Sequence, residues 1–189
     1  MNIHHPVPTI YGRDTEKFEE LWKAQVSALQ TQFGDQIEEV WWPLKQEVEV
    51  PVVFFKKEVI VDALRFAKES TELKFNFLSD ISATDEQPDP LRFHLFYNLF
   101  SHTNLNRIRF KVRVKEGESV PTVVSVWSGA NWLEREVFDM FGVRFEGHPD
   151  LRRILMDERW EGHPLRKDYP LRRYQFHPVP MEPQEKLLK

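Results

Sequence analysis

The chain has 189 residues, no cysteine and a formal net charge of −4. The lack of cysteine excludes disulfides, thiol catalysis and cysteine-ligated iron–sulfur clusters within this chain. The mildly negative charge disfavours a protein whose main role is non-specific binding of nucleic acid.

The hydrophobic fraction of 41%, with 15 Phe and 6 Trp, is sufficient for one packed domain with or without extensions. No apolar run approaches the roughly twenty residues that cross a bilayer. The N-terminus lacks the apolar stretch of a signal peptide. We therefore expect a cytoplasmic protein that contacts a membrane only through partners.

The first eighty residues are predicted to alternate between helices and strands. Residues 1–13 contain His and Pro without a period, and we expect an extended arm there. Pro51 cannot donate a ladder hydrogen bond, so its strand is predicted to be an edge strand or to be broken at that point. Apolar periodicity and stop signals predict helices at 15–33 and 58–69 and strands at 37–42, 47–55 and 75–82.

The clearest β signal follows a polar loop at 85–90. Residues 91–99 and 108–114 alternate apolar and polar side chains around a polar turn, which predicts a long antiparallel hairpin. A last strand is expected at 122–127. Between the apolar positions of the second hairpin strand stand Arg107, Arg109, Lys111, Arg113 and Lys115.

This basic row could bind RNA, but sheet-type RNA readers stack bases on aromatic side chains of the same face. Phe110 is on the opposite face from the basic side chains. We therefore predict a solvated face, or one that meets an acidic neighbour, in preference to an RNA site.

A short helix is predicted to begin at Asn131 and to end at Gly142, which suits a helix C-terminus. Asn131 is the expected N-cap, with Glu134 as its capping partner three residues later. Arg135 and Asp139 are four residues apart and are expected to pair on the outer face. Glu136 shares this helix. Catalysis by its three carboxylates is not expected.

From residue 143 the chain loses periodicity and becomes rich in Arg, Pro and aromatic residues. Glu-Gly-His-Pro occurs at 146–149 and again at 161–164, and each Pro favours an extended path. A segment that is rich in Arg and aromatic residues and cannot form a core of its own is typical of a protein–protein interface. The predicted partner-binding residues are Arg144, Arg152, Arg153, Trp160, His163, Arg166, Lys167, Tyr169, Arg172 and Arg173.

Two alternatives for this segment stay open. Asp150, Asp157 and Asp168 could neutralise part of the Arg cluster within the chain, as an internally paired knot. His148, Asp150, His163 and Asp168 are possible metal ligands by residue type. No helical His or Glu spacing supports a metal, however, and it is disfavoured.

Residues 134–142, together with 147–156 and 161–171, closely resemble the 30 kDa (C-type) subunit of the proton-pumping NADH:quinone oxidoreductases, respiratory complex I. The resemblance covers about forty-five residues and includes the family's Glu-Arg-Glu signature. It departs at Ser128 and Leu133. It implies a structural and assembly subunit of the hydrophilic arm, on the cytoplasmic side of a bacterial membrane. It also implies no cofactor and no catalytic residue in this chain.

The same resemblance implies the large quinone-site (D-type) subunit as partner, among other subunits of the arm. Flavin and iron–sulfur clusters would be held by partner subunits, and electron transfer from NADH to quinone would be coupled to proton translocation. An equivalent subunit of a membrane-bound hydrogenase or of a ferredoxin- or deazaflavin-dependent complex is the alternative, and an independent RNA-binding module is a weaker one.

Together these observations predict an α+β fold with an antiparallel or mixed sheet and helices on one face, followed by an extended irregular C-terminal ribbon. The predicted division is an N-terminal arm and helix at 1–34, an α+β domain at 35–142 and a partner-binding ribbon at 143–189. The middle domain is expected to fold without the ribbon.

Overall fold

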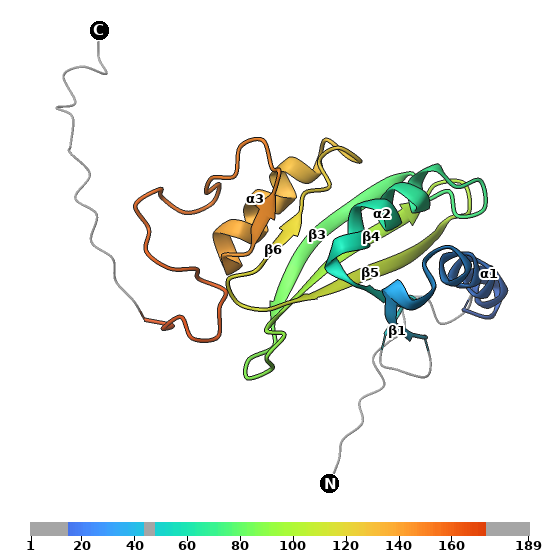
Figure 1. Cartoon of the computed structure of the whole chain (residues 1–189), viewed down its shortest axis with the longest axis horizontal. Coiled ribbons are helices and arrows are strands. Elements are labelled where there is room, and N and C mark those ends of the chain that lie inside the picture. Colours follow the sequence, from blue (N-terminus) through green and yellow to red (C-terminus); the bar gives the residue numbers. More distant parts are fainter. Residues whose placement is uncertain (1–14, 44–47, 173–189) are drawn as a thin grey trace, which may run out of the picture.

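The computed structural model describes residues 15–43 and 48–172, and Figure 1 shows its arrangement. The predicted arm at 1–13 and the end of the predicted ribbon lie outside the described residues. The helices are α1 (Thr15–Phe33), α2 (Ile60–Glu69) and α3 (Ala130–Phe141), with single 3-10 turns η1 (Gly34–Gln36) and η2 (Lys57–Val59). The strands are β1 (Ile37–Trp41), β2 (Val52–Phe55), β3 (Phe77–Asp85), β4 (Phe93–Ser101), β5 (Asn106–Val114), β6 (Ser119–Pro121) and β7 (Arg144–Glu146).

Five strands form one mixed sheet in the order β1-β2-β5-β4-β3. Within it the pair of β2 with β5 is parallel, and the other three pairs are antiparallel. The predicted long hairpin is β4 and β5, paired from Phe93 with Val114 to Ser101 with Asn106. The α+β class with a mixed sheet is confirmed.

The helices cover one face of this sheet. Along β4, Phe93, Leu95, Tyr97 and Leu99 are buried, whereas the side chains between them are half-buried. The buried set shares one core with Ala63 and Leu64 of α2 and with Val137 of α3. In Figure 1, α2 lies across the strands, α1 lies at one end of the sheet and α3 lies near the other. Full burial of each large apolar side chain stabilises the fold by about 1.5–3 kcal/mol.

The strand predicted at 122–127 is wrong. Residues 124–126 form a turn, and Glu134 accepts the backbone N–H of Val123 and the hydroxyl of Thr122 in place of a strand partner. The strand before them is the short β6, which pairs in parallel with β7. The strand predicted at 47–55 is broken at Pro51, which is one of the two predicted alternatives, since β2 begins at Val52. It is not an edge strand, because β2 lies between β1 and β5. Pro51 precedes the strand, and its carbonyl accepts the N–H of Arg109 at 3.0 Å.

The pairing of β6 with β7 continues the folded structure past Gly142. Val143 and Phe145 are each 3% exposed and belong to the core. The predicted division at 142/143 stays a prediction, but contacts cross it. Within the described part of the chain, no helix combines the length and apolar character needed to span a bilayer.

Candidate functional site

The helix α3 and the segment after it, residues 143–172, form the site that the sequence singles out. We call residues 143–172 the ribbon. In Figure 1 it leaves α3 as a long irregular loop and returns toward the sheet. Its contacts with α3 determine which of the predicted partner-binding side chains face outward.

The helix α3 begins without a side-chain cap. Its N-cap is Gly129, and Asn131 is its second residue, so the predicted Asn131 cap is wrong. The chain already turns before the helix, and carbonyls of Trp127, Ser128 and Gly129 accept the first free N–H groups. These groups are the donors that a capping side chain would otherwise satisfy. The carbonyl of Asn131 lies 3.2 Å from Nε2 of His148.

Glu134 is fully buried and does not act as a capping partner. Its carboxylate accepts the Thr122 hydroxyl at 2.5 Å and the Val123 N–H at 2.7 Å. Nε2 of His148 lies 3.9 Å from the same carboxylate. Burial raises the pKa of Glu134 to about 7, against the two hydrogen bonds, which lower it. Glu134 therefore holds α3 against the turn that follows β6.

Asp139 organises the ribbon. One of its carboxylate oxygens accepts the backbone N–H groups of Ile154, Leu155 and Met156 at 2.8–3.0 Å. The other pairs with Nη1 of Arg153 at 2.6 Å. Burial alone would raise the pKa of Asp139, but these donors together hold it below its usual value. The fully buried carboxylate is thus a charged anchor for the loop at 153–156.

Arg135 also points toward the ribbon. Its guanidinium donates to the carbonyls of Arg152 and Arg153, both at 3.1 Å, and lies over the ring of Trp132. The predicted pair of Arg135 with Asp139 on the outer face is therefore wrong. Both side chains are buried, and both serve the returning loop. Glu136, between them, is exposed.

Side chains of the ribbon lie very close to the backbone at the C-terminus of α3. Gly142 has φ +77°, and a Cβ on it would lie 2.5 Å from Nη2 of Arg166 and from the ring of His163. The His163 ring contacts the Asp139 carbonyl at 2.9 Å, and burial lowers the pKa of His163. Arg166 donates to the carbonyl of Phe141 and pairs with Glu116 at 2.7 Å.

A second ionic cluster fixes the end of the ribbon. Arg92 is 6% exposed and bonds Asp85, Asp168 and Glu116 at 2.7–2.9 Å. The same Asp85 accepts the backbone N–H of Lys167. The bonds from Arg92 dominate over burial and lower the pKa of Asp85 to about 2. Sequence reasoning did not find this cluster, because its members are far apart along the chain.

The four candidate metal ligands considered from the sequence do not converge on one point, and they have hydrogen-bond or ion-pair partners within the chain. Nδ1 of His148 accepts the N–H of Asp150, His163 contacts the Asp139 carbonyl, and Asp168 pairs with Arg92. Within residues 15–43 and 48–172, no group of three His, Asp or Glu side chains is placed to hold a metal ion.

The ribbon therefore divides its predicted partner-binding residues into two sets. Arg153 and Arg166 face inward, and Trp160 stacks on Tyr169 with ring centroids 6.5 Å apart. Arg173 lies outside the described residues. Among the predicted residues, the exposed cationic side chains are those of Arg144, Arg152, Lys167 and Arg172.

Large apolar side chains accompany these cations. Trp132 of α3 is 61% exposed and Leu171 is 98% exposed, with Leu155 and Leu165 more than half exposed. Large apolar side chains that are this exposed are candidates for contact with a partner. Sequence reasoning missed these four residues, because a segment without periodicity does not show which side chains face outward. We call Arg144, Arg152, Lys167, Arg172 and the four apolar residues the outer ribbon surface.

The basic face of β5 carries aromatic side chains from neighbouring strands. Phe110 of β5 itself is buried in the core on the opposite face, as predicted. Phe96 and Phe100 of β4 and Phe54 of β2 share the basic face with the cations. Strand pairing supplies these rings from neighbouring strands. The pattern of β5 alone could not show them.

Residues 53–175 match the family described as "Respiratory-chain NADH dehydrogenase, 30 Kd subunit". The chain is 56% identical over 117 residues to a C-type subunit of NADH-quinone oxidoreductase from Rhizobium meliloti, which covers 62% of this chain and 64% of that protein. It is 49% identical over 142 residues to the C-type subunit of the same name from Rhizobium etli, covering 75% and 74%. It is 49% identical over 148 residues to the C-type subunit from Trichlorobacter lovleyi, covering 77% and 88%.

Proposed function

Because this chain belongs to the family of the 30 kDa subunit of respiratory-chain NADH dehydrogenases, we propose that it is a structural and assembly subunit of such an enzyme. The parent complex would transfer electrons from NADH to quinone and couple this transfer to proton translocation. The family match is the observation that carries the proposal. The three relatives described above are named as NADH-quinone oxidoreductase subunits, so the hydrogenase and ferredoxin alternatives find no support there.

We propose that the chemistry of the complex takes place in other subunits. This chain has no cysteine to ligate an iron–sulfur cluster. The buried carboxyl groups of Glu134 and Asp139 are hydrogen-bonded to their own chain, which is a structural use of these side chains. Flavin and clusters would be held by the partners. The chain would lie on the cytoplasmic side of the membrane, peripheral through the complex.

The outer ribbon surface is the proposed contact with the large quinone-site subunit. Its cations lie on a backbone that Asp139 and Arg92 hold in place. A fixed segment loses little conformational entropy on association, which favours tight binding. The exposed apolar side chains would supply the desolvated centre of the contact, and Arg144 and Arg152 its charged rim.

Affinity purification of the tagged chain from cells tests this proposal. We expect NADH-oxidising, quinone-reducing activity and the large quinone-site subunit to co-purify with it. The isolated chain should show no flavin or cluster absorbance. Arg152→Glu should reduce recovery of the large quinone-site subunit, whereas Arg65→Glu on the exposed side of α2 should not. Recovery of a hydrogenase in place of an NADH-oxidising enzyme would refute the proposal.

A further inference from the structure

The sheet face that the helices leave uncovered carries a row of cations with few anionic partners. Arg113 pairs with Glu38 at 3.3 Å and with Glu39 at 2.5 Å. Arg107, Arg109 and Lys111 have no carboxylate within ion-pair distance among the described residues. Burial lowers the pKa of both Arg109 and Lys111. Partly desolvated cations without counter-charges favour a bound anion.

The aromatic rings of this face lie beneath the cations. Arg107 lies over Phe100 at 5.5 Å, Arg109 over Phe96 at 5.3 Å and Lys111 over Trp41 at 5.3 Å. A ring covered by a guanidinium or ammonium group cannot serve as an open platform for a nucleobase. The face therefore favours carboxylates over nucleic acid.

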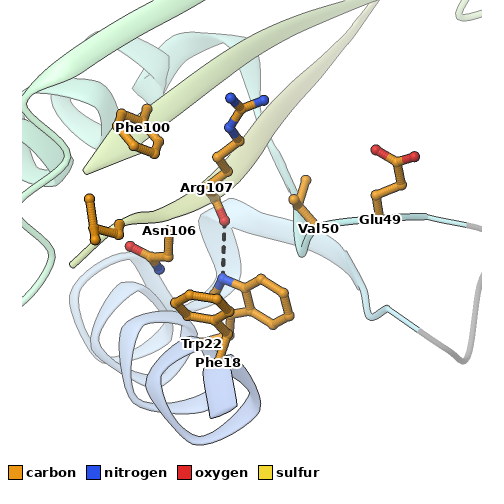
Figure 2. A pocket seen from close by; sticks show the side chains of 8 residues that line it. Phe18, Trp22, Glu49, Val50, Phe100, Asn106 and Arg107 are labelled. Atoms are coloured by element: carbon orange, nitrogen blue, oxygen red, sulfur yellow. Dashed lines mark hydrogen bonds between the residues drawn. The ribbon is translucent and has the colours of Figure 1, made fainter. Parts of the chain in front are cut away.

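A cavity adjoins the end of this face (Figure 2). It measures about 120 Å³, and Phe18 and Trp22 of α1 line it with Phe100 and Arg107. The indole N–H of Trp22 donates to the Arg107 carbonyl at 3.1 Å, which fixes α1 against β5. Since a water molecule takes roughly 30 Å³ of liquid, the cavity has room for one apolar side chain.

Leu105 lines the same cavity. Both its backbone conformation and its exposure are unfavourable for a leucine in the isolated chain. It sits in the turn between β4 and β5 with φ +52° and is 67% exposed. Asn or Gly would adopt this left-handed backbone more easily and would not expose an apolar side chain. A leucine at this position is explained if a binding partner buries its side chain.

We propose that the β5 cations and this cavity form a second docking surface, which binds an acidic segment carrying one apolar anchor side chain. Arg107 joins the two parts, because its side chain belongs to the cationic row and its residue lines the cavity. The inference rests on the proposed function in one respect: the acidic segment belongs to another subunit of the same complex.

Two variants of the full chain test the surface in the complex. Arg107→Glu should weaken retention of the chain about tenfold or more, as expected when a desolvated charge pair is reversed. Leu105→Asn should weaken retention while leaving the melting temperature of the isolated chain unchanged or higher. Arg65→Glu on α2 is the matched control and should behave as wild type.

A photoreactive benzoyl-phenylalanine at Phe77, which is 47% exposed at the edge of this face, would identify the occupant. The expected cross-link joins a Glu- or Asp-rich segment of another subunit, and the same group at Arg65 should not reach it. Cross-links to nucleic acid or to this chain's own residues 1–14 or 173–189 would overturn the inference. Full retention of both variants would overturn it while leaving the proposed function intact. Absence of the wild-type chain from the complex would refute both.

Discussion

Replacement of Asp139 by Ala should detach the ribbon from α3. The change removes the acceptor of three backbone N–H groups and the counter-charge of Arg153, whose side chain is 13% exposed. Loss of one member of a buried ion pair costs about 3–5 kcal/mol. The three orphaned N–H groups would each add about 1–3 kcal/mol if they stayed buried. The ribbon is therefore expected to open and rehydrate these groups, which limits the net loss to about 3–5 kcal/mol.

Urea unfolding of the full chain at pH 7, followed by tryptophan fluorescence, measures this loss. The pKa of Asp139 is depressed in the folded chain, so its stabilisation is present above the unfolded pKa and is lost as pH falls through the folded value. The matched control is Asp150→Ala, since Asp150 pairs with Arg152 on the surface of the same ribbon and is half-exposed. The control should cost less than about 1 kcal/mol. Equal losses in the two variants would show that the ribbon does not depend on Asp139.

Three further outcomes are expected. Glu134→Gln should gain stability relative to wild type as pH rises from about 4.5 to 7, by about 3 kcal/mol, because the raised pKa of Glu134 favours the neutral acid in the fold; urea midpoints at pH 5 and pH 8 that move in parallel would contradict this. Truncation after Gly142 should strongly lower the thermal midpoint relative to the full chain, because Val143 and Phe145 belong to the core; equal midpoints would restore the expectation that the domain folds without the ribbon. Arg144→Glu should lower co-purification with the large quinone-site subunit without changing the melting temperature of the isolated chain, because Arg144 is exposed.

Local patterns predicted the parts of the fold whose contacts are local or strictly periodic. The helix at 15–33 and the hairpin of β4 and β5 were predicted closely, because apolar spacing alone specifies their buried faces. The predicted strand at 122–127 failed for the opposite reason. A carboxylate eleven residues downstream accepts the Val123 N–H, and the strand ladder loses its donor.

The role of α3 could not be predicted from its own sequence. Arg135 and Asp139 have the spacing of a surface pair, yet both bond a loop that returns fourteen to eighteen residues later. The exposed residues of the ribbon could not be predicted either, because its sequence has no periodicity that distinguishes buried from exposed side chains. The Arg-rich composition did indicate that this segment is special. The structure separates its internal anchors from its exposed side chains.

The order in which the chain is made gives the Asp85–Arg92 cluster a further consequence. Both residues emerge during synthesis long before Lys167 and Asp168, which complete their hydrogen bonds across 82 and 76 positions. A partly synthesised chain that already contains the sheet therefore lacks the bonds of Lys167 to Asp85 and of Asp168 to Arg92. Closing so long a loop is slow relative to local helix and hairpin formation. Docking of the ribbon onto Asp85 and Arg92 is therefore expected to be a late step of folding.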